Sequence, residues 1–192
     1  MLFFNTSNAN KKIVLQHRVF LSIGANLGDR AKNIFQAINL LNQSGVYVNR
    51  ISDIFETTPM GKLSVFNIKL NFRLPNFLNC VAEAVTNYQP YQLLLIIHRI
   101  ERILGRKRIV FIKNLPRTID IDILFYDDKI IDELKIKIPH PRICQRAFVL
   151  VPLCEIAPDL IHPQYHNTIQ NLTNLVDKKG VKIWQQPTTI LS

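Results

Sequence analysis

Short apolar runs alternate along this chain with stretches in which apolar residues recur every three or four positions. The runs at residues 19–23, 46–56 and 78–85 are typical of strands, whereas the recurring positions that follow Asp29 and Pro90 are typical of amphipathic helices. Asp29 is a good helix N-cap, and proline is favoured as the first residue of a helix. The first half of the chain therefore predicts three strands and two helices.

Each predicted helix has a buried stripe and a glycine just beyond its end. Glycine is favoured there because it adopts the left-handed backbone that often ends a helix. The stripes are Ile34, Ala37, Ile38 and Leu41, followed by Gly45, and Leu93, Ile96, Ile97, Ile100 and Leu104, followed by Gly105.

A further strand is predicted at residues 116–126, and it carries two acids. Asp120 and Asp122 would share one face of this strand, with their Cα atoms about 6–7 Å apart, while isoleucines fill the other face. Like charges on one strand face repel, so we expect a positive group between them. Two carboxylates suit Mg²⁺, and Arg117 could bind phosphate oxygens. The alternative is a half-exposed strand whose polar face is acidic.

The order of the elements predicts the fold class. Strand, helix, strand, strand, helix, strand is the ferredoxin-like β-α-β-β-α-β pattern, an α+β sandwich in which helices pack on a mainly antiparallel sheet. Beyond the acidic strand we expect a strand at 130–138, ended by the prolines around His140, and helices at 148–156 and 169–176. These make an extra hairpin and helices at the C-terminal end.

The composition of the chain limits the class of protein to which it can belong. With 192 residues and 47% apolar side chains, we expect a single domain at 18–192 behind a loose leader at 1–17. The net charge of +10 indicates an anionic partner such as a nucleotide or nucleic acid. Three cysteines without metal-type spacing favour a reduced compartment. The apolar runs are too short to cross a bilayer, and the first residues lack a signal-peptide core, so we expect a cytoplasmic protein.

Seven blocks in sequence carry a resemblance to a known family. The chain resembles the 6-hydroxymethyl-7,8-dihydropterin pyrophosphokinases over roughly residues 19–163. The blocks are LSIGANLGDR at 21–30, FETTPMG at 55–61, FLN at 77–79, GR at 105–106, PRTIDID at 116–122, IPHPR at 138–142 and RAF at 146–148.

The resemblance implies a nucleotide site. Asp120 and Asp122 would hold two Mg²⁺ ions that bridge the triphosphate, and together with Arg106 and Arg117 they would form the catalytic set. The residues that bind ATP would be His98, Glu101, Arg106, Arg117, His140 and Arg146. Without the family, Arg106, Arg146, His98 and Glu101 would be interpreted as surface residues.

The resemblance also implies a pterin site. Phe77 and Phe148 would sandwich the flat ring, and Asn79 would read its donor and acceptor edge. The other pterin-binding residues, acting largely through backbone groups, would be Thr57, Pro59 and Met60. Where family members often have a Trp-Gly pair on a closing loop, this chain has residues 113–115, which contain no aromatic residue.

The implied activity is a Mg²⁺-dependent transfer of pyrophosphate from ATP to the pterin alcohol, which gives AMP and the pterin diphosphate in folate biosynthesis. We expect a monomer whose partners are ATP and the pterin, with no nucleic acid and no membrane. Two alternatives remain. An RNA-binding ferredoxin-like module needs exposed aromatic residues on its central strands, and the first strand offers only Phe20. An inactive homologue would be expected to have lost a metal acid or an arginine, and all are present.

Overall fold

The structure is a computed structural model that describes residues 16–59, 74–107 and 115–185 and the backbone of 64–65, 68–69 and 112–113. Its centre is an antiparallel sheet with the strand order β13-β3-β6-β1-β8, and β2 pairs with the far half of β6. The strands of this sheet are β1 (His17–Ala25), β2 (Val46–Ile51), β3 (Phe55–Thr57), β6 (Phe77–Thr86), β8 (Asp120–Tyr126) and β13 (Val181–Ile183).

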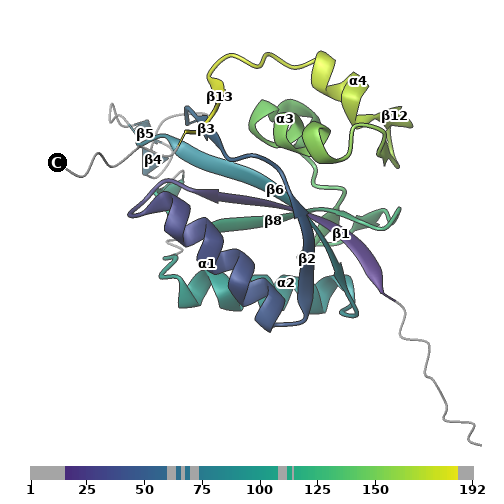
Figure 1. Ribbon diagram of the computed structural model, residues 1–192, viewed down its shortest axis with the longest axis horizontal. Coiled ribbons are helices and arrows are strands. Elements are labelled where there is room, and N and C mark those ends of the chain that lie inside the picture. The colour runs from purple at the N-terminus through teal and green to yellow at the C-terminus, as the bar shows by residue number, and fades with distance from the viewer. Residues whose placement is uncertain are drawn as a thin grey trace, which may run out of the picture.

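Helices cover both faces of the sheet, so the described part of the molecule has three layers (Figure 1). On one face lie α1 (Arg30–Gln43) and α2 (Pro90–Ile103), and on the other lie α3 (Ala147–Ile156) and α4 (Ile169–Asn174). The remaining short elements are β4 (Ser64–Val65), β5 (Ile68–Lys69), β7 (Ile112–Lys113), β9 (Ile131–Asp132), β10 (Lys137–Ile138), β11 (Ile161–His162), β12 (Asn167–Thr168) and a 3-10 turn, Ile143–Gln145. The predicted α+β, ferredoxin-like class is confirmed.

The ends of α1 and α2 follow the predicted signals. The Asp29 side chain caps α1 by accepting a hydrogen bond from the backbone N–H of Lys32, at 3.0 Å. Pro90 is the first residue of α2. Gly45 and Gly105 follow the two C-caps with φ of 82° and 80°, a conformation that suits glycine because it lacks a Cβ atom.

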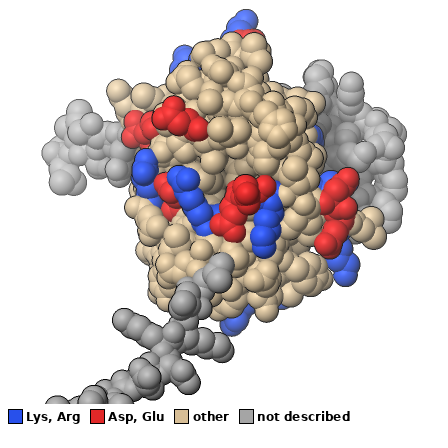
Figure 2. Space-filling model, turned by 90° about the vertical axis from the view of Figure 1, so that its right-hand side faces the viewer, with Lys and Arg blue, Asp and Glu red and all other residues tan. Residues whose placement is uncertain are grey.

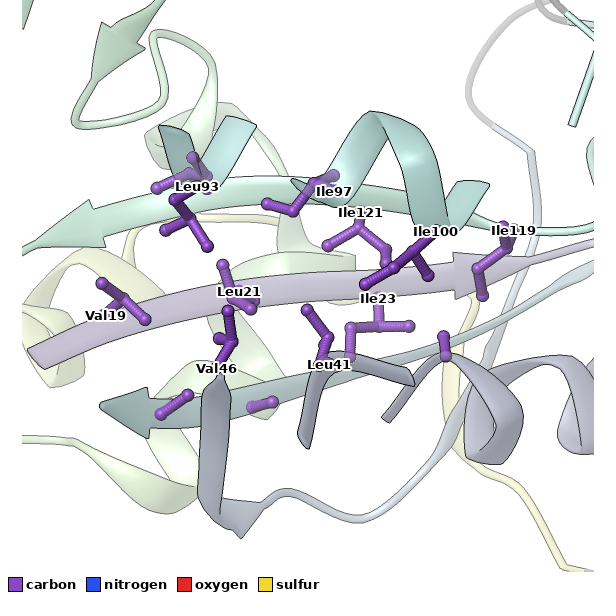
Figure 3. Packing of buried hydrophobic residues seen from close by; sticks show 14 of the residues in the cluster. Val19, Leu21, Ile23, Leu41, Val46, Leu93, Ile97, Ile100, Ile119 and Ile121 are labelled. Atoms are coloured by element: carbon purple, nitrogen blue, oxygen red, sulfur yellow. The ribbon is translucent and has the colours of Figure 1, made fainter. Parts of the chain in front are cut away.

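One core lies between the sheet and the pair α1 and α2. Figure 3 shows Ile23 of β1 beside Ile100 of α2 and Leu41 of α1, and Val19 and Leu21 of the same strand belong to this cluster. The predicted helix stripes supply most of the remaining contacts, since Ile34, Ala37, Leu41 and Ile100 are also buried in this cluster. Ile119, Ile121 and Ile123 join it as well, which leaves Asp120 and Asp122 on the opposite face of β8.

A second core fills the other side of the sheet. Phe20 of β1 and Phe125 of β8 meet edge to face there, with ring centroids 6.3 Å apart. The apolar residues of α3 and α4 pack on them. Phe20, the aromatic residue that an RNA-binding sheet would have exposed, is therefore buried under these helices.

Two predicted strands were wrong in detail. The run at 46–56 is divided into β2 and β3, because Ser52 turns inward and its hydroxyl accepts a hydrogen bond from the backbone N–H of Val81 at 3.0 Å. The run at 130–138 is a hairpin of β9 and β10 and not one strand. The strand β13 and the hairpin β11–β12 were not predicted, because strands of two or three residues carry no periodic signal.

The surface and the termini bear on two other expectations. On the side of the molecule where β1 begins, basic and acidic side chains are interspersed and do not gather by sign (Figure 2). Arg18 and Arg50 both contact Glu83, at 2.7 and 3.5 Å. Among the described helices, none is long and apolar enough to span a bilayer. Most of the leader predicted at 1–17 lies outside the described residues.

Candidate active site

A cavity of about 470 Å³ opens at one end of the strands, where β1 and β3 end and β6 and β8 begin. The strand registers bring these ends together, because Gly24 of β1 lies between Asn79 of β6 and Asp120 of β8. The residues that line the cavity are Ser22, Gly24, Thr57, Thr58, Pro59, Leu74, Phe77, Asn79, Arg106, Arg117, Asp120, Asp122, His140, Arg142, Gln145, Arg146 and Phe148.

The two predicted acids face this cavity, and basic side chains surround them. Asp120 pairs with Arg106 and with Arg117, whose Nη1 lies 2.8 Å from Oδ2 of Asp120. Asp122 accepts a hydrogen bond from Nη1 of Arg146 at 3.2 Å. Arginines therefore lie beside both acids and offset the repulsion between the carboxylates, while the Mg²⁺ predicted between them stays a prediction.

Glu101 is a buried residue and not the surface residue that its position on a helix would suggest. Its side chain is 1% exposed, and it accepts the backbone N–H of Ile121 at 3.0 Å as well as the Arg106 guanidinium. The backbone N–H of Arg106 also donates to the Glu101 carbonyl, at 2.9 Å. Glu101 therefore fixes Arg106 and the start of β8 relative to α2.

His98 does not line the main cavity. Together with Glu101, Arg102 and Arg106, it lines a second hollow of about 250 Å³. Arg106 borders both spaces. The structure thus places His98 and Glu101 behind Arg106, whereas the other predicted ATP-binding residues face the main cavity.

His140 and Arg146 form the far side of the acidic region. The His140 backbone N–H donates to the Leu124 carbonyl at 3.0 Å, which fixes the proline-flanked loop to β8. Burial lowers the pKa of His140, and the positive charges of Arg146 and Arg142 lower it further, although Asp122 opposes them. Burial also lowers the pKa of Arg146. The lowered pKa of His140 favours its neutral form at neutral pH.

The opposite end of the cavity has aromatic and amide groups. Asn79 is 4% exposed, and its Nδ2 donates to Oγ1 of Thr57 at 2.7 Å. A Cβ atom on Gly24 would lie 2.5 Å from Oδ1 of Asn79, so only glycine at that position leaves the amide in place. The rings of Phe77 and Phe148 line the cavity, and Phe148 also packs against the second core.

Each of these rings has an arginine over it. The guanidinium carbon of Arg117 lies 5.5 Å from the centroid of Phe77, and that of Arg146 lies 5.5 Å from the centroid of Phe148. The aromatic end and the acid–arginine end of the cavity are therefore in direct contact. Pro59 is also at the cavity, whereas Met60 lies outside the described residues.

Asn26 links the backbone segments that carry the two ends of the cavity. It is 2% exposed, its Oδ1 accepts the backbone N–H of Arg117 at 2.7 Å, and its Nδ2 donates to the Pro75 carbonyl at 3.3 Å. The backbone N–H of Asn26 donates to the Arg117 carbonyl at 3.1 Å. The turn after β1 thus holds the segment before β8 and the segment before β6 together.

The structure adds lining residues that the sequence analysis did not name. Ser22, Gly24, Thr58 and Arg142 could have been found, because they lie in the blocks that carry the family resemblance, whereas Leu74 and Gln145 lie outside those blocks. The added residues are Ser22, Gly24, Thr58, Leu74, Arg142 and Gln145.

The acids can hold a metal only together with other ligands. In the described part of the chain, no three or more His, Cys, Asp or Glu side chains gather as a metal cage. Asp120 and Asp122 offer hard oxygen ligands to the open cavity, and Mg²⁺ typically binds one or two carboxylates and completes its shell with water and phosphate oxygens. The donor set therefore fits Mg²⁺ bound jointly with a phosphate ligand.

Comparison with known proteins decides the family. A family model described as 7,8-dihydro-6-hydroxymethylpterin-pyrophosphokinase (HPPK) matches residues 20–158, which include every predicted site residue. The chain belongs to the HPPK family. A relative from Aquifex aeolicus, named 2-amino-4-hydroxy-6-hydroxymethyldihydropteridine pyrophosphokinase, is 39% identical over 152 residues, which are 79% of this chain and 88% of the relative.

Other similar proteins are much longer than this chain. The folic acid synthesis protein fol1 of Pneumocystis carinii is 41% identical over 145 residues, 76% of this chain, but the chain spans only 18% of that protein's length. Among solved structures, a Plasmodium falciparum HPPK-DHPS triple mutant with SDX-DHP superposes with a TM-score of 0.63 at 19% identity, over 85% of this chain and 45% of that one. At this identity the likeness supports the fold alone.

Proposed function

We propose that this protein transfers pyrophosphate from ATP to 6-hydroxymethyl-7,8-dihydropterin, giving AMP and the pterin diphosphate for folate biosynthesis. One observation carries the proposal: a single cavity joins an acid–arginine end to an aromatic–amide end, in a chain of the HPPK family. The first end suits a metal-bound triphosphate, and the second suits a flat, hydrogen-bonding ring.

The nucleotide end requires the acids and the basic side chains together. Asp120 and Asp122 would hold two Mg²⁺ ions with the triphosphate, and the ions would supply neutralisation of phosphate charge. Arg106, Arg117 and Arg146 now contact carboxylates and would turn to phosphate oxygens, which they can bind through two N–H groups. Further ATP contacts are assigned to His140 and His98, and Glu101 would act on ATP indirectly by holding Arg106.

The pterin end orients the second substrate. Phe77 and Phe148 would stack on the two faces of the ring, and Asn79, held by Thr57, would pair with its edge. The backbone of Thr57, Pro59 and Met60 would complete the contact. Because Asn79 is buried, a ring without matching donors and acceptors would leave its amide unpaired, and such substrates would be rejected.

Catalysis would rest on position and charge. The pterin hydroxymethyl oxygen attacks the β-phosphorus of ATP, the bond from that phosphorus to the oxygen of the α-phosphate breaks, and AMP leaves. Arg106 and Arg117 would stabilise the charge that moves onto the transferring group and the leaving oxygen. No covalent protein nucleophile is required, and the proposed unit is a monomer.

The product nucleotide tests this proposal. The purified protein is incubated with ATP, Mg²⁺ and fresh reduced pterin, and the quenched reaction is separated by chromatography. We expect AMP, formed only when the pterin is present. ADP as the pterin-dependent product would instead mean attack at the terminal phosphorus, as in ordinary kinases.

A further inference from the structure

The strand β13 forms the outer edge of the sheet beside the proposed pterin site, beyond the segment that matches the family model. It pairs antiparallel with β3, with Val181 opposite Thr57 and Ile183 opposite Phe55. The Trp184 backbone N–H then donates to the Ile54 carbonyl at 2.8 Å. Figure 1 shows the chain passing from α4 across the top of the molecule to reach this edge.

Pairing with β13 stabilises β3, which is too short to be stable as the outermost strand of the sheet. β3 has three residues, and without β13 it would be an exposed edge with unpaired backbone groups. Strands this short depend on neighbours for stability. Thr57 at the end of β3 lines the cavity and accepts the hydrogen bond that orients Asn79. The position of β3 therefore determines the position of the amide.

Gly180, just before β13, lies next to Thr58, which lines the cavity beside Thr57. Its φ is 82°, and a Cβ atom there would lie 2.8 Å from Oγ1 of Thr58, which also lines the cavity. Threonine is branched at Cβ and has few alternative side-chain positions, so a larger residue at 180 would displace Thr58 or lift β13 from β3.

The other end of β13 is anchored in the core. Trp184 is partly buried against the cluster between the sheet and the first two helices. Before Gly180, the Lys179 backbone N–H donates to Oδ1 of Asp177 at 2.9 Å, and that of Val181 donates to the Lys178 carbonyl at 3.1 Å. The strand is thus held on both sides of its contact with β3.

We propose that β13 sets the pterin wall formed by Thr57 and Thr58, and that Gly180 is a positioning residue for pterin binding. The inference rests on the proposed function for the identity of the ring. The phosphate end is formed by other elements, since Asp120 and Asp122 lie on β8 at the opposite edge of the sheet. A disturbance at Gly180 should therefore affect the pterin and leave ATP binding unchanged.

The test is the variant Gly180→Ala, with KM for each substrate and kcat measured separately. We expect KM for the pterin to rise about tenfold, equivalent to about 1.4 kcal/mol, with KM for ATP within about twofold of wild type. Gly45→Ala is the matched control, because Gly45 has the same φ of 82° in the turn between α1 and β2. It should lower stability without a change in either KM.

A double-mutant cycle identifies the contact. In a Thr58→Ala background the obstructing hydroxyl is absent, so Gly180→Ala should raise the pterin KM much less than it does in wild type. An equal rise in both backgrounds would overturn the route through Thr58. Equal rises in both substrates' KM, or no change in the pterin KM, would overturn the proposal itself.

Hydrogen exchange of the wild-type protein decides the question if Gly180→Ala does not fold. The amides of Val181–Ile183 and Trp184 should exchange more slowly once the pterin and a non-hydrolysable ATP analogue are bound. Unchanged exchange in a protein that forms AMP would overturn the role of β13 while leaving the proposed function intact. A wild-type protein that forms no AMP would overturn the proposed function instead.

Discussion

Asp120 and Asp122 are the residues on which the chemistry depends most directly. Each is partly exposed at the cavity and paired with an arginine, so neither is required to fill the core. Their neighbours Ile119, Ile121 and Ile123 carry the packing. At this strand, function and stability are therefore assigned to alternate residues, and they can be separated by mutation.

Asp120→Asn and Asp122→Asn should each lower kcat at least about a hundredfold, a loss typical of removing one charge-stabilising group. The midpoint of thermal unfolding should change little, because asparagine keeps the size of the side chain at a partly exposed site. Asp128→Asn, in the exposed turn after β8, is the control and should retain full activity. Either variant keeping most of its activity in saturating Mg²⁺ would contradict the metal-ligand assignment.

Arg117→Ala should lower kcat more than it raises KM for the pterin, because its guanidinium is assigned to the phosphates and its charge matters most in the transition state. Arg117→Lys should restore only part of the loss, since lysine cannot form the paired contact. Arg99→Ala, at an exposed position of α2, provides the comparison and should have no effect. If kcat and pterin affinity fell equally, Arg117 would be structural.

Among the elements, those with a long periodic pattern were predicted and the short ones were not. The helices α1 and α2 follow their apolar stripes, and α3 and α4 lie where helices were expected. By contrast, β13 exists only through pairing with the distant strand β3, and the two-residue strands of the hairpin β11–β12 are too short to carry a periodic pattern. The same distinction holds for the cavity, where Asp120 belongs to a motif but Leu74 and Gln145 reach the site only through folding.

The buried His162 of the hairpin β11–β12 makes the free energy of unfolding depend on pH. His162 is 1% exposed, its ring packs against Phe125 with centroids 5.4 Å apart, and burial lowers its pKa below the ordinary 6.5. Below that pH the unfolded chain binds more protons than the folded one, so stability falls as the pH drops. Above about pH 7 this group should contribute no slope.

His162→Gln should therefore reduce the difference in unfolding free energy between about pH 7.5 and about pH 5.5, measured by denaturant titration. His140 should account for part of the slope that remains, because its pKa is also lowered. His166→Asn, an exposed residue of the same hairpin with φ of 50°, is the matched control, since asparagine tolerates this backbone. A slope that His162→Gln leaves unchanged would show that burial of this ring does not affect its titration.

At the scale of the whole molecule, the three-layer arrangement explains how the cavity forms. Two helices bury one face of the sheet and two bury the other, so side chains at the strand ends are left for the cavity. On the face of Figure 2, charges of both signs are interspersed, which gives no support there to an RNA-binding surface despite the net charge of +10. The positive charges that matter for the proposal are the arginines around Asp120 and Asp122.

Phosphorus NMR of the isolated pterin product tests the central claim most directly. If the cavity directs the pterin alcohol to the β-phosphorus, the β- and γ-phosphates of ATP must move together, and the product should show two coupled phosphorus signals of a diphosphate ester. The Asp120→Asn protein should form it at least about a hundredfold more slowly under the same conditions. A single phosphorus signal on the pterin, or a wild-type protein that leaves the pterin unmodified, would contradict the account.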